Sequence, residues 1–268
     1  MDISNKSLIK DKCYINGQWI NSYNGELIEV NNPSNLEIIA KVPKCGKEET
    51  KIAIESAYHS WSDWKNRPAI ERANFLKNWF HLIEKNHEDL ARIMTLEQGK
   101  PIIEARGEIT YGASFVEWFA EESKRIYGDI IPDRLADRRI MVLKQPVGVV
   151  GAITPWNFPS SMITRKCAPA LAVGCPVVIK PASQTPLSAL ALAVLAEEAG
   201  FPKGIMNVIT GSANEIGNEL TSNTLVKKVS FTGSTEIGKI LLAQCSSTVK
   251  KVSMELGGHA PFIIFEDA

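Results

Sequence analysis

Three polar motifs directly follow three predicted strands along the sequence. They are Thr-Pro-Trp-Asn at 154–157, Lys-Pro-Ala-Ser at 180–183 and Thr-Gly-Ser at 232–234. An open parallel sheet binds its ligands beyond the carboxyl ends of its strands. The three motifs together therefore predict one binding site at that edge of a sheet.

Two of these motifs carry groups that suit a phosphate or a sugar. Gly233 allows the backbone to approach a ligand, and Ser234 at a predicted helix start can donate to a phosphate oxygen. Lys180 ends a buried strand, where its cation can contact a phosphate or ribose hydroxyls. Each also has a plainer interpretation, because glycine and serine are common at helix starts and Lys180 could be a surface lysine at the sheet edge.

Beyond residue 148, short apolar strands alternate with helices. We expect strands at 149–153, 177–179, 206–209, 228–231 and 252–254, and helices near 161–173, 187–199, 214–222 and 235–246. This alternation predicts an α/β fold with a mostly parallel, doubly wound sheet.

The first half of the chain is predicted to be mainly helical. Alternating residues around Asn16-Gly17 indicate a hairpin at 14–20, and a second strand pair is expected around Asn24-Gly25 and 38–40. Amphipathic helices are predicted at 48–64, 68–85, 87–98 and from 101 toward 125, followed by a strand at 138–145. These helices are expected to pack around the sheet.

Composition limits the partners of the protein. Thirty basic residues balance thirty acidic ones, so neither nucleic acid nor a membrane is expected as the main partner. The first residues have no apolar stretch typical of a signal peptide. Five scattered cysteines indicate reduced thiols and a cytoplasmic protein, and four histidines show no spacing suited to a metal site.

Two longer motifs around these residues, and a third near the end of the sequence, resemble the aldehyde dehydrogenase superfamily. They are Pro-Trp-Asn-Phe-Pro at 155–159, Phe-Thr-Gly-Ser-Thr at 231–235 and Ser-Met-Glu-Leu-Gly-Gly at 253–258. Segments 14–17, 96–101 and 112–120 are similar to the succinate-semialdehyde branch, so the likeness covers essentially all 268 residues.

The resemblance implies a Rossmann-like fold with N-terminal helices and a small β segment. It also implies an organisation into an N-terminal part of the cofactor domain (1–126), an oligomerisation strand segment (127–147), a Rossmann-like NAD(P)-binding core (148–255) and the start of a catalytic domain (256–268). The resemblance further implies that the full-length protein is a homo-oligomer.

The same resemblance implies roles for individual residues. Glu255 corresponds to the general base of the family, and Asn157 to the amide that holds the oxyanion. Taken alone, Glu255 could be a solvated surface glutamate and Asn157 a turn residue that bonds its own backbone. The positions implied to contact the cofactor are Trp156, Asn157, Lys180, Pro181, Ala182, Ser183, Gly233, Ser234 and Leu256.

Two residues indicate which cofactor and substrate the site would take. Many relatives that prefer NAD have a glutamate where this chain has Ser183, and a glutamate would repel a 2′-phosphate; serine with Lys180 nearby favours NADP, with NAD possible. Arg165 lies where succinate-semialdehyde dehydrogenases bind the distal carboxylate, and a guanidinium suits a carboxylate bidentately. The alternative is a surface arginine on an amphipathic helix.

The Gly-Gln-x-Cys segment that carries the family's nucleophile does not occur in this sequence, and none of its five cysteines has that motif. Three interpretations follow. The chain is the N-terminal part of an NADP-dependent succinate-semialdehyde dehydrogenase, or of an enzyme for another aldehyde such as glutarate semialdehyde; it is a non-catalytic nucleotide-binding module; or it is an unstable fragment. In each case we expect the isolated chain to be inactive.

Overall fold

The computed structural model describes residues 3–268. A seven-stranded sheet forms its centre, in the order β11-β10-β7-β8-β9-β1-β2. Its parallel strands are β7 (Val149–Ile153), β8 (Val177–Lys180), β9 (Met206–Val208), β10 (Val226–Thr232) and β11 (Lys251–Glu255), and β1 (Cys13–Ile15) and β2 (Gln18–Ile20) extend it antiparallel. The predicted doubly wound parallel sheet is confirmed.

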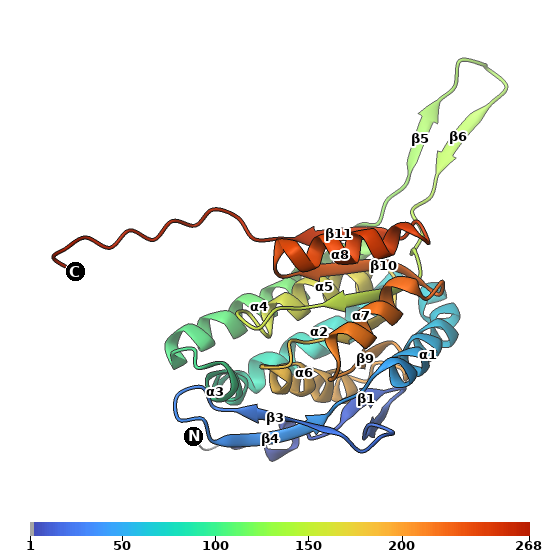
Figure 1. Cartoon of the computed structure of the whole chain (residues 1–268). Helices are drawn as coiled ribbons and strands as arrows, with labels where there is room; N and C mark the ends of the chain where they lie inside the picture. Colours follow the sequence, from blue (N-terminus) through green and yellow to red (C-terminus); the bar gives the residue numbers. More distant parts are fainter. Residues whose placement is uncertain (1–2) are drawn as a thin grey trace.

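Helices cover both faces of this sheet (Figure 1). Those of the second half are α5 (Ser161–Ala172), α6 (Pro186–Glu198), α7 (Ala213–Ser222) and α8 (Thr235–Ser246). Since parallel crossovers are right-handed, α5 and α6 lie on one face and α7 and α8 on the other, where α1 (Lys47–Asn66) joins them. The order in which the strands are added to the sheet therefore reverses between β7 and β10.

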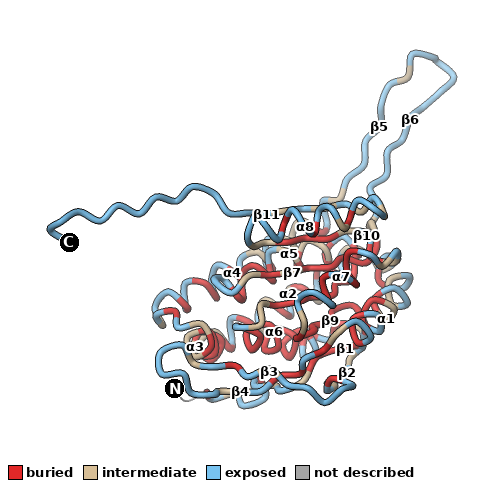
Figure 2. The backbone as a smooth tube through the Cα atoms, viewed as in Figure 1, coloured by how far each residue is buried: buried red, intermediate tan, exposed pale blue. Residues whose placement is uncertain are grey.

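A further helical layer covers α5 and α6. It consists of α2 (Ala69–Lys85), α3 (His87–Gln98) and α4 (Ile102–Glu122). This layer explains why α6 is apolar on all sides, with residues 186–196 all buried between the sheet and the outer helices (Figure 2). The predicted packing of the N-terminal helices around the sheet is observed.

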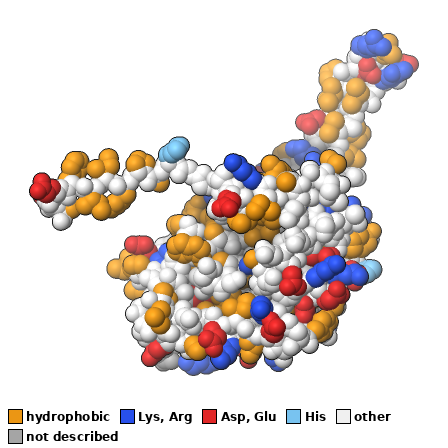
Figure 3. Space-filling view, in the orientation of Figure 1, with side chains coloured by type: hydrophobic (Ala, Val, Ile, Leu, Met, Phe, Trp, Pro, Cys, Tyr) orange, Lys and Arg blue, Asp and Glu red, His pale blue; other side chains and the backbone are white. Residues whose placement is uncertain are grey.

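Two segments extend away from the body, namely the hairpin of β5 (Asp129–Pro132) and β6 (Arg139–Val142), and residues 256–268. Both are exposed, and apolar side chains gather on them (Figure 3). In residues 256–268 these include Phe262 and Phe265, and in the hairpin Ile130 and Met141. Two short 3-10 helices, η1 (Lys6–Leu8) and η2 (Ser123–Arg125), lie before β1 and after α4.

One strand pair differs from its prediction. β3 (Leu27–Asn31) pairs with β4 (Ile38–Pro43) through a turn at 32–37, so Asn24-Gly25 lies before the pair and does not join its strands. The side chain of Asn24 accepts a hydrogen bond from the Glu26 N–H, which makes it a local turn at the entry to β3. By contrast, Asn16 and Gly17 both have positive φ and form the predicted turn between β1 and β2.

Trp64 joins two layers of the fold. Its ring is fully buried against Phe75 and Phe201, with centroid distances of 5.5 and 5.8 Å. Its indole N–H donates to the Leu171 carbonyl at 3.1 Å, which ties the end of α1 to the end of α5.

Trp64→Ala is expected to lower the free energy of unfolding by about 3–5 kcal/mol, because it opens a cavity and removes this hydrogen bond. Urea denaturation measures the change. Trp118 on α4 is exposed, so Trp118→Ala is a matched control with an expected change within about 0.5 kcal/mol. Equal losses in the two variants would contradict the role assigned to Trp64.

Candidate functional site

The register of the sheet brings the three polar motifs to one edge. Lys180 pairs with Ile153, Ile153 with Phe231, and Thr232 with Glu255. The loops after β7, β8 and β10 therefore leave the sheet side by side at its carboxyl edge. Because α5 leaves β7 toward one face and α8 follows β10 on the other, the strand order reverses between β7 and β10, and open α/β sheets bind ligands at such a reversal.

Lys180 is buried in this edge, with 6% of its surface exposed. Burial lowers the pKa of its amine to about 8. Within residues 3–268 the amine has no hydrogen-bond or ion-pair partner. The alternative of a surface lysine is therefore excluded, and a buried cation without a partner is suited to an anionic ligand. Ser183, three residues further, is half-buried.

The turn after β10 leaves donors for a ligand. The Ser234 hydroxyl accepts from the Ile237 N–H at 3.3 Å and so begins α8 as its N-cap, while its own proton stays free to be donated. The Gly233 N–H donates to the Glu255 carbonyl at 3.1 Å. The buried hydroxyls of Thr154 and Thr232, at the ends of β7 and β10, have no partner among the described residues. Unpaired buried hydroxyls at this edge are consistent with a polar ligand.

Leu256 packs on the same helix. Gly238 in α8 has no Cβ, and an added Cβ would collide with the Leu256 side chain. The glycine therefore allows the chain after β11 to cross closely over the start of α8. Leu256 remains partly exposed, beside the turn that contains Gly233 and Ser234.

Asn157 lies exposed in the loop after β7, next to the exposed ring of Trp156. Its side-chain amide has no partner within residues 3–268, so it does not bond its own backbone as the alternative interpretation required. Its backbone carbonyl accepts from the Lys100 amine at 2.9 Å. The loop is thus fixed through its backbone, and the amide is left available to a ligand.

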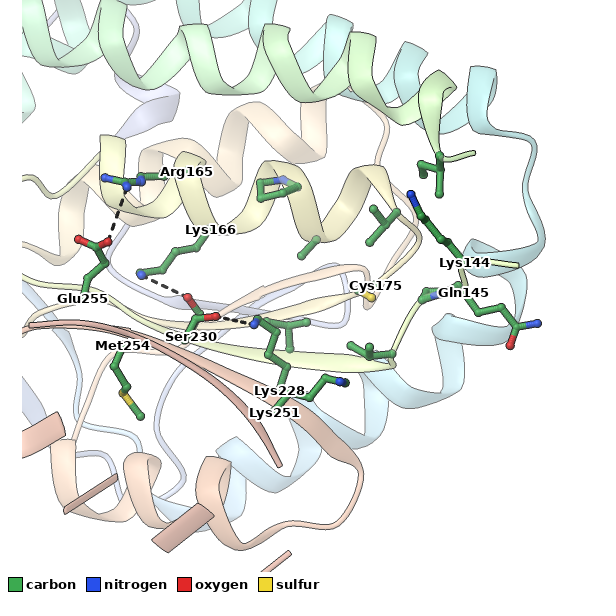
Figure 4. A pocket seen from close by; sticks show the side chains of 18 residues that line it. Lys144, Gln145, Arg165, Lys166, Cys175, Lys228, Ser230, Lys251, Met254 and Glu255 are labelled. Atoms are coloured by element: carbon green, nitrogen blue, oxygen red, sulfur yellow. Dashed lines mark hydrogen bonds and ion pairs between the residues drawn. The ribbon is translucent and has the colours of Figure 1, made fainter. Parts of the chain in front are cut away.

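Glu255 and Arg165 face a cavity of about 680 Å³ between α5 and the strands β10 and β11 (Figure 4). The guanidinium of Arg165 lies 3.7 Å from the carboxylate of Glu255 and 5.9 Å from the Phe115 ring. Five cations and one carboxylate line the cavity: Lys144, Arg165, Lys166, Lys228, Lys251 and Glu255. A cavity of this charge favours an anionic occupant.

Lys166 is a candidate that the sequence motifs did not reveal. Its amine donates to the Ser230 hydroxyl at 3.2 Å in the same cavity. Burial lowers its pKa to about 8, while the Cys167 thiol and the Glu255 carboxylate oppose part of this change. Helical spacing could have found it, because 165, 166, 169 and 170 share one face of α5 and, with the C-cap residue 173, line the cavity. An amine with this pKa can exchange protons near neutral pH.

The residues of this edge and cavity lie within a segment that matches a known family. The profile of the aldehyde dehydrogenase family matches residues 19–268. The chain belongs to the aldehyde dehydrogenase family. Its central sheet is the Rossmann-like fold of that family.

Individual relatives of this aldehyde dehydrogenase chain cover its whole length. It is 59% identical to the NADP(+) succinate-semialdehyde dehydrogenase of Escherichia coli and 60% identical to the glutarate-semialdehyde dehydrogenase of Pseudomonas aeruginosa, over all 268 residues. The crystal structure of an E. coli NADP-dependent enzyme superposes on 99% of the chain with a TM-score of 0.96 and 59% identity. The chain spans 56% of the length of the two sequence relatives and 55% of the structural one.

The cysteines of this aldehyde dehydrogenase chain are all free and buried. Cys175 lines the cavity but precedes β8 at the amino edge of the sheet, whereas Glu255 ends β11 at the carboxyl edge (Figure 4). Burial raises the pKa of Cys175, which keeps it a thiol at neutral pH. Cys175 therefore does not lie beside Glu255 as a nucleophile would.

Among residues 3–268, no cluster of three or more histidine, cysteine, aspartate or glutamate side chains is suited to a metal. Nor is any described helix long and apolar enough to cross a membrane.

Proposed function

We propose that this chain supplies the cofactor-binding part of an NADP-dependent aldehyde dehydrogenase whose substrate is a short aldehyde with a terminal carboxylate. Succinic semialdehyde is the first candidate and glutarate semialdehyde the second, after the names of the relatives. The observation that carries the proposal is the pair of Arg165 and Glu255, which lies where the cationic cavity reaches the carboxyl edge of the sheet. A carboxylate at one end of the substrate suits the arginine, and an aldehyde at the other end suits the base.

The residues of the strand edge fit a dinucleotide phosphate. Lys180 offers a buried cation without a protein partner, and Ser183 leaves room beside it for a 2′-phosphate. Ser234 can donate to a phosphate oxygen at the start of α8. Trp156, Pro181, Ala182, Gly233 and Leu256 complete the proposed contacts. The nicotinamide, when bound, supplies the acceptor for the hydride of the aldehyde.

Two groups of the chain serve the acyl chemistry in this proposal. Glu255 takes the proton from the nucleophilic thiol, or later from the water that hydrolyses the thioester. The free side-chain amide of Asn157 donates to the oxygen of the former carbonyl when it becomes negatively charged. Because the Asn157 loop is fixed through its backbone, this donor needs little reorganisation during the reaction.

The nucleophile is absent from this part of the enzyme. All five cysteines are buried, and none of them lies in the motif of the family's nucleophile. We therefore propose that the chain alone binds nucleotide without turnover. Tests of catalysis use the completed enzyme, defined as this chain followed by the part of the E. coli relative that lies beyond the match.

NADP is expected to stabilise the chain itself. At 100 times its Kd, a ligand adds about 2.7 kcal/mol to the free energy of unfolding, which corresponds to about 5–10 °C in Tm for a chain of this size. A melting experiment with increasing NADP and NAD measures the effect. A saturable rise with NADP at lower concentration than with NAD supports the proposal. A rise with neither nucleotide would overturn it.

Ser183→Glu is expected to weaken NADP binding by about tenfold or more, because like charges in an interface cost several kcal/mol. NAD binding should stay the same or become tighter, since a glutamate can accept from the ribose 2′-hydroxyl. Ser183→Gln has the same size without the charge and should weaken NADP less. Isothermal titration of both variants with both nucleotides provides the comparison, and equal losses for NADP and NAD would remove Ser183 from the 2′-phosphate site.

We also propose that the complete protein is a homo-oligomer. The exposed apolar residues of the β5–β6 hairpin support this, because an apolar strand pair that extends from the body is an exposed pairing edge.

A further inference from the structure

Three buried charged residues lie behind the active-site loops. Glu97 is in the last turn of α3, Lys100 follows it, and Glu108 is in α4. Their exposed fractions are 3%, 9% and 3%. We call these three residues the buried charge cluster. Burying a charge is costly unless the group is paired and hydrogen-bonded, so each of these side chains needs partners.

Lys100 and Glu108 hold the loop that carries Asn157. The Lys100 amine donates to the Glu108 carboxylate at 2.5 Å and to the Asn157 carbonyl at 2.9 Å, and it lies 4.0 Å from the centre of the Phe158 ring. The other oxygen of Glu108 accepts from the N–H groups of Ser160 and Ser161, at 3.0 and 3.1 Å. The pair thus fixes the Asn157 loop (154–160) at both its middle and its end.

Glu97 holds the second loop. Its two oxygens accept from the N–H groups of Leu187 at 2.6 Å and Ser188 at 2.8 Å, in the first turn of α6. Thr185 at the N-cap of α6 makes no side-chain cap of its own, so Glu97 provides the cap from another helix. α6 begins directly after the loop 181–185, which contains Ser183. Burial raises the pKa of Glu97 to about 7, and the hydrogen bonds from α6 oppose part of this rise.

Two glycines allow one short segment to reach both loops. Gly99 has φ of +81°, a left-handed conformation that ends α3 and separates Glu97 from Lys100 by a tight turn. In α4, a Cβ on Gly112 would lie 3.2 Å from the Ser161 Cα, so the glycine allows α4 to approach the start of α5. Glu108 lies one helical turn before Gly112 and therefore meets the Ser160 and Ser161 N–H groups.

We propose that the buried charge cluster is a positioning device that holds the Asn157 loop and the 181–185 loop at a fixed separation. It would thereby align the oxyanion donor with the bound dinucleotide. Glu97 and Lys100 act through the loops and touch neither ligand, so they are positioning residues. This inference rests on the proposed function, because it needs nucleotide at the second loop and an oxyanion at the first.

The Glu97 contacts are tested on the chain itself by nucleotide titration. Glu97→Gln retains one acceptor and turns an amide toward the other N–H, so the loop should loosen and Kd for NADP should rise by about tenfold, the effect of losing one good hydrogen bond. Glu49→Gln is the matched control, because Glu49 is also buried and accepts from two backbone N–H groups, those of Tyr23 and Gly46, outside both loops. Its Kd should stay within about twofold. If Glu97→Gln shows no cooperative melting, Glu97→Asp replaces it, with an expected rise of about threefold or more.

The Lys100 contacts are tested in the completed enzyme. Lys100→Met should lower kcat by about 100-fold, since a displacement near 1 Å in an active site costs about this much, while Kd for NADP stays within about threefold. Lys100→Arg, which retains donors for both partners, should recover part of the loss. If Lys100 had only a structural role, Lys100→Met would lower Tm but would not lower kcat about 100-fold while leaving Kd for NADP nearly unchanged.

The outcomes separate this inference from the function on which it rests. If the unaltered chain binds no nucleotide, the proposed function fails and the inference fails with it. If the unaltered chain binds NADP, but Glu97→Gln and Lys100→Met change Kd and kcat no more than Glu49→Gln does, only the positioning role is overturned. A rise in Kd specific to position 97 and a loss of kcat specific to position 100 would support it.

Discussion

Glu255→Gln in the completed enzyme is expected to lower kcat by about 10²–10⁴-fold, the contribution typical of a positioned general base. An amide has no basic lone pair to take the proton of a thiol or of water, yet it has nearly the size and shape of the carboxylate. Steady-state oxidation of succinic semialdehyde at saturating NADP measures the loss.

The structure indicates how to separate this chemical effect from a loss of stability. Glu255 is exposed, and its ion pair with Arg165 has a length of 3.7 Å between side chains that are 60% and 43% exposed. Such a pair contributes at most about 1 kcal/mol, so Tm and NADP affinity of Glu255→Gln should remain close to those of the unaltered protein. Glu198→Gln, at the exposed end of α6, should change neither kcat nor Tm. A loss of less than about tenfold in kcat would exclude Glu255 as the base.

The sheet was predictable because its strands are short apolar runs between helical patterns. The carboxyl edge was predictable for the same reason, since Lys180 ends β8 and Asn157 and Ser234 lie in the loops that follow β7 and β10. The register of the strands could not be derived from the sequence, although it places Ile153, Lys180 and Phe231 side by side on neighbouring strands. Registers depend on pairing between distant segments, and the sequence of one strand does not contain them.

Other features of the site depend on packing between layers. The sequence showed Glu97 and Lys100 only as part of a segment similar to a family, because nothing local indicates that Glu97 caps a helix 90 residues later. The sequence could not predict that Lys180 is buried either, since a lysine at the end of a strand is more often solvated. Asn24-Gly25 is the opposite case, because its strong local turn signal predicts a hairpin, whereas the turn lies before β3 and joins no strands.

Arg165→Leu in the completed enzyme is expected to raise KM for succinic semialdehyde by about 10- to 150-fold. A hydrogen bond to a charged group contributes about 1.5–3 kcal/mol, and the guanidinium can form two parallel ones with the distal carboxylate. The cationic wall of the cavity leaves other lysines near the substrate, so binding should weaken without being abolished. Arg165→Lys keeps the charge but loses the two parallel donors of the guanidinium, so its KM should lie between those of the unaltered enzyme and Arg165→Leu.

Butanal gives the comparison that assigns this effect to the carboxylate. It has the four carbons of succinic semialdehyde with a methyl group in place of the carboxylate, so it has nothing to offer the guanidinium. Because Arg165 also lies 3.7 Å from Glu255, its loss can change the base and thereby the oxidation of both aldehydes. The ratio of kcat/KM for the two substrates cancels that shared effect, and we expect it to fall by at least about tenfold in Arg165→Leu. An unchanged ratio would show that Arg165 acts on the base alone, and the preference for a terminal carboxylate would then have to come from the lysines of the cavity.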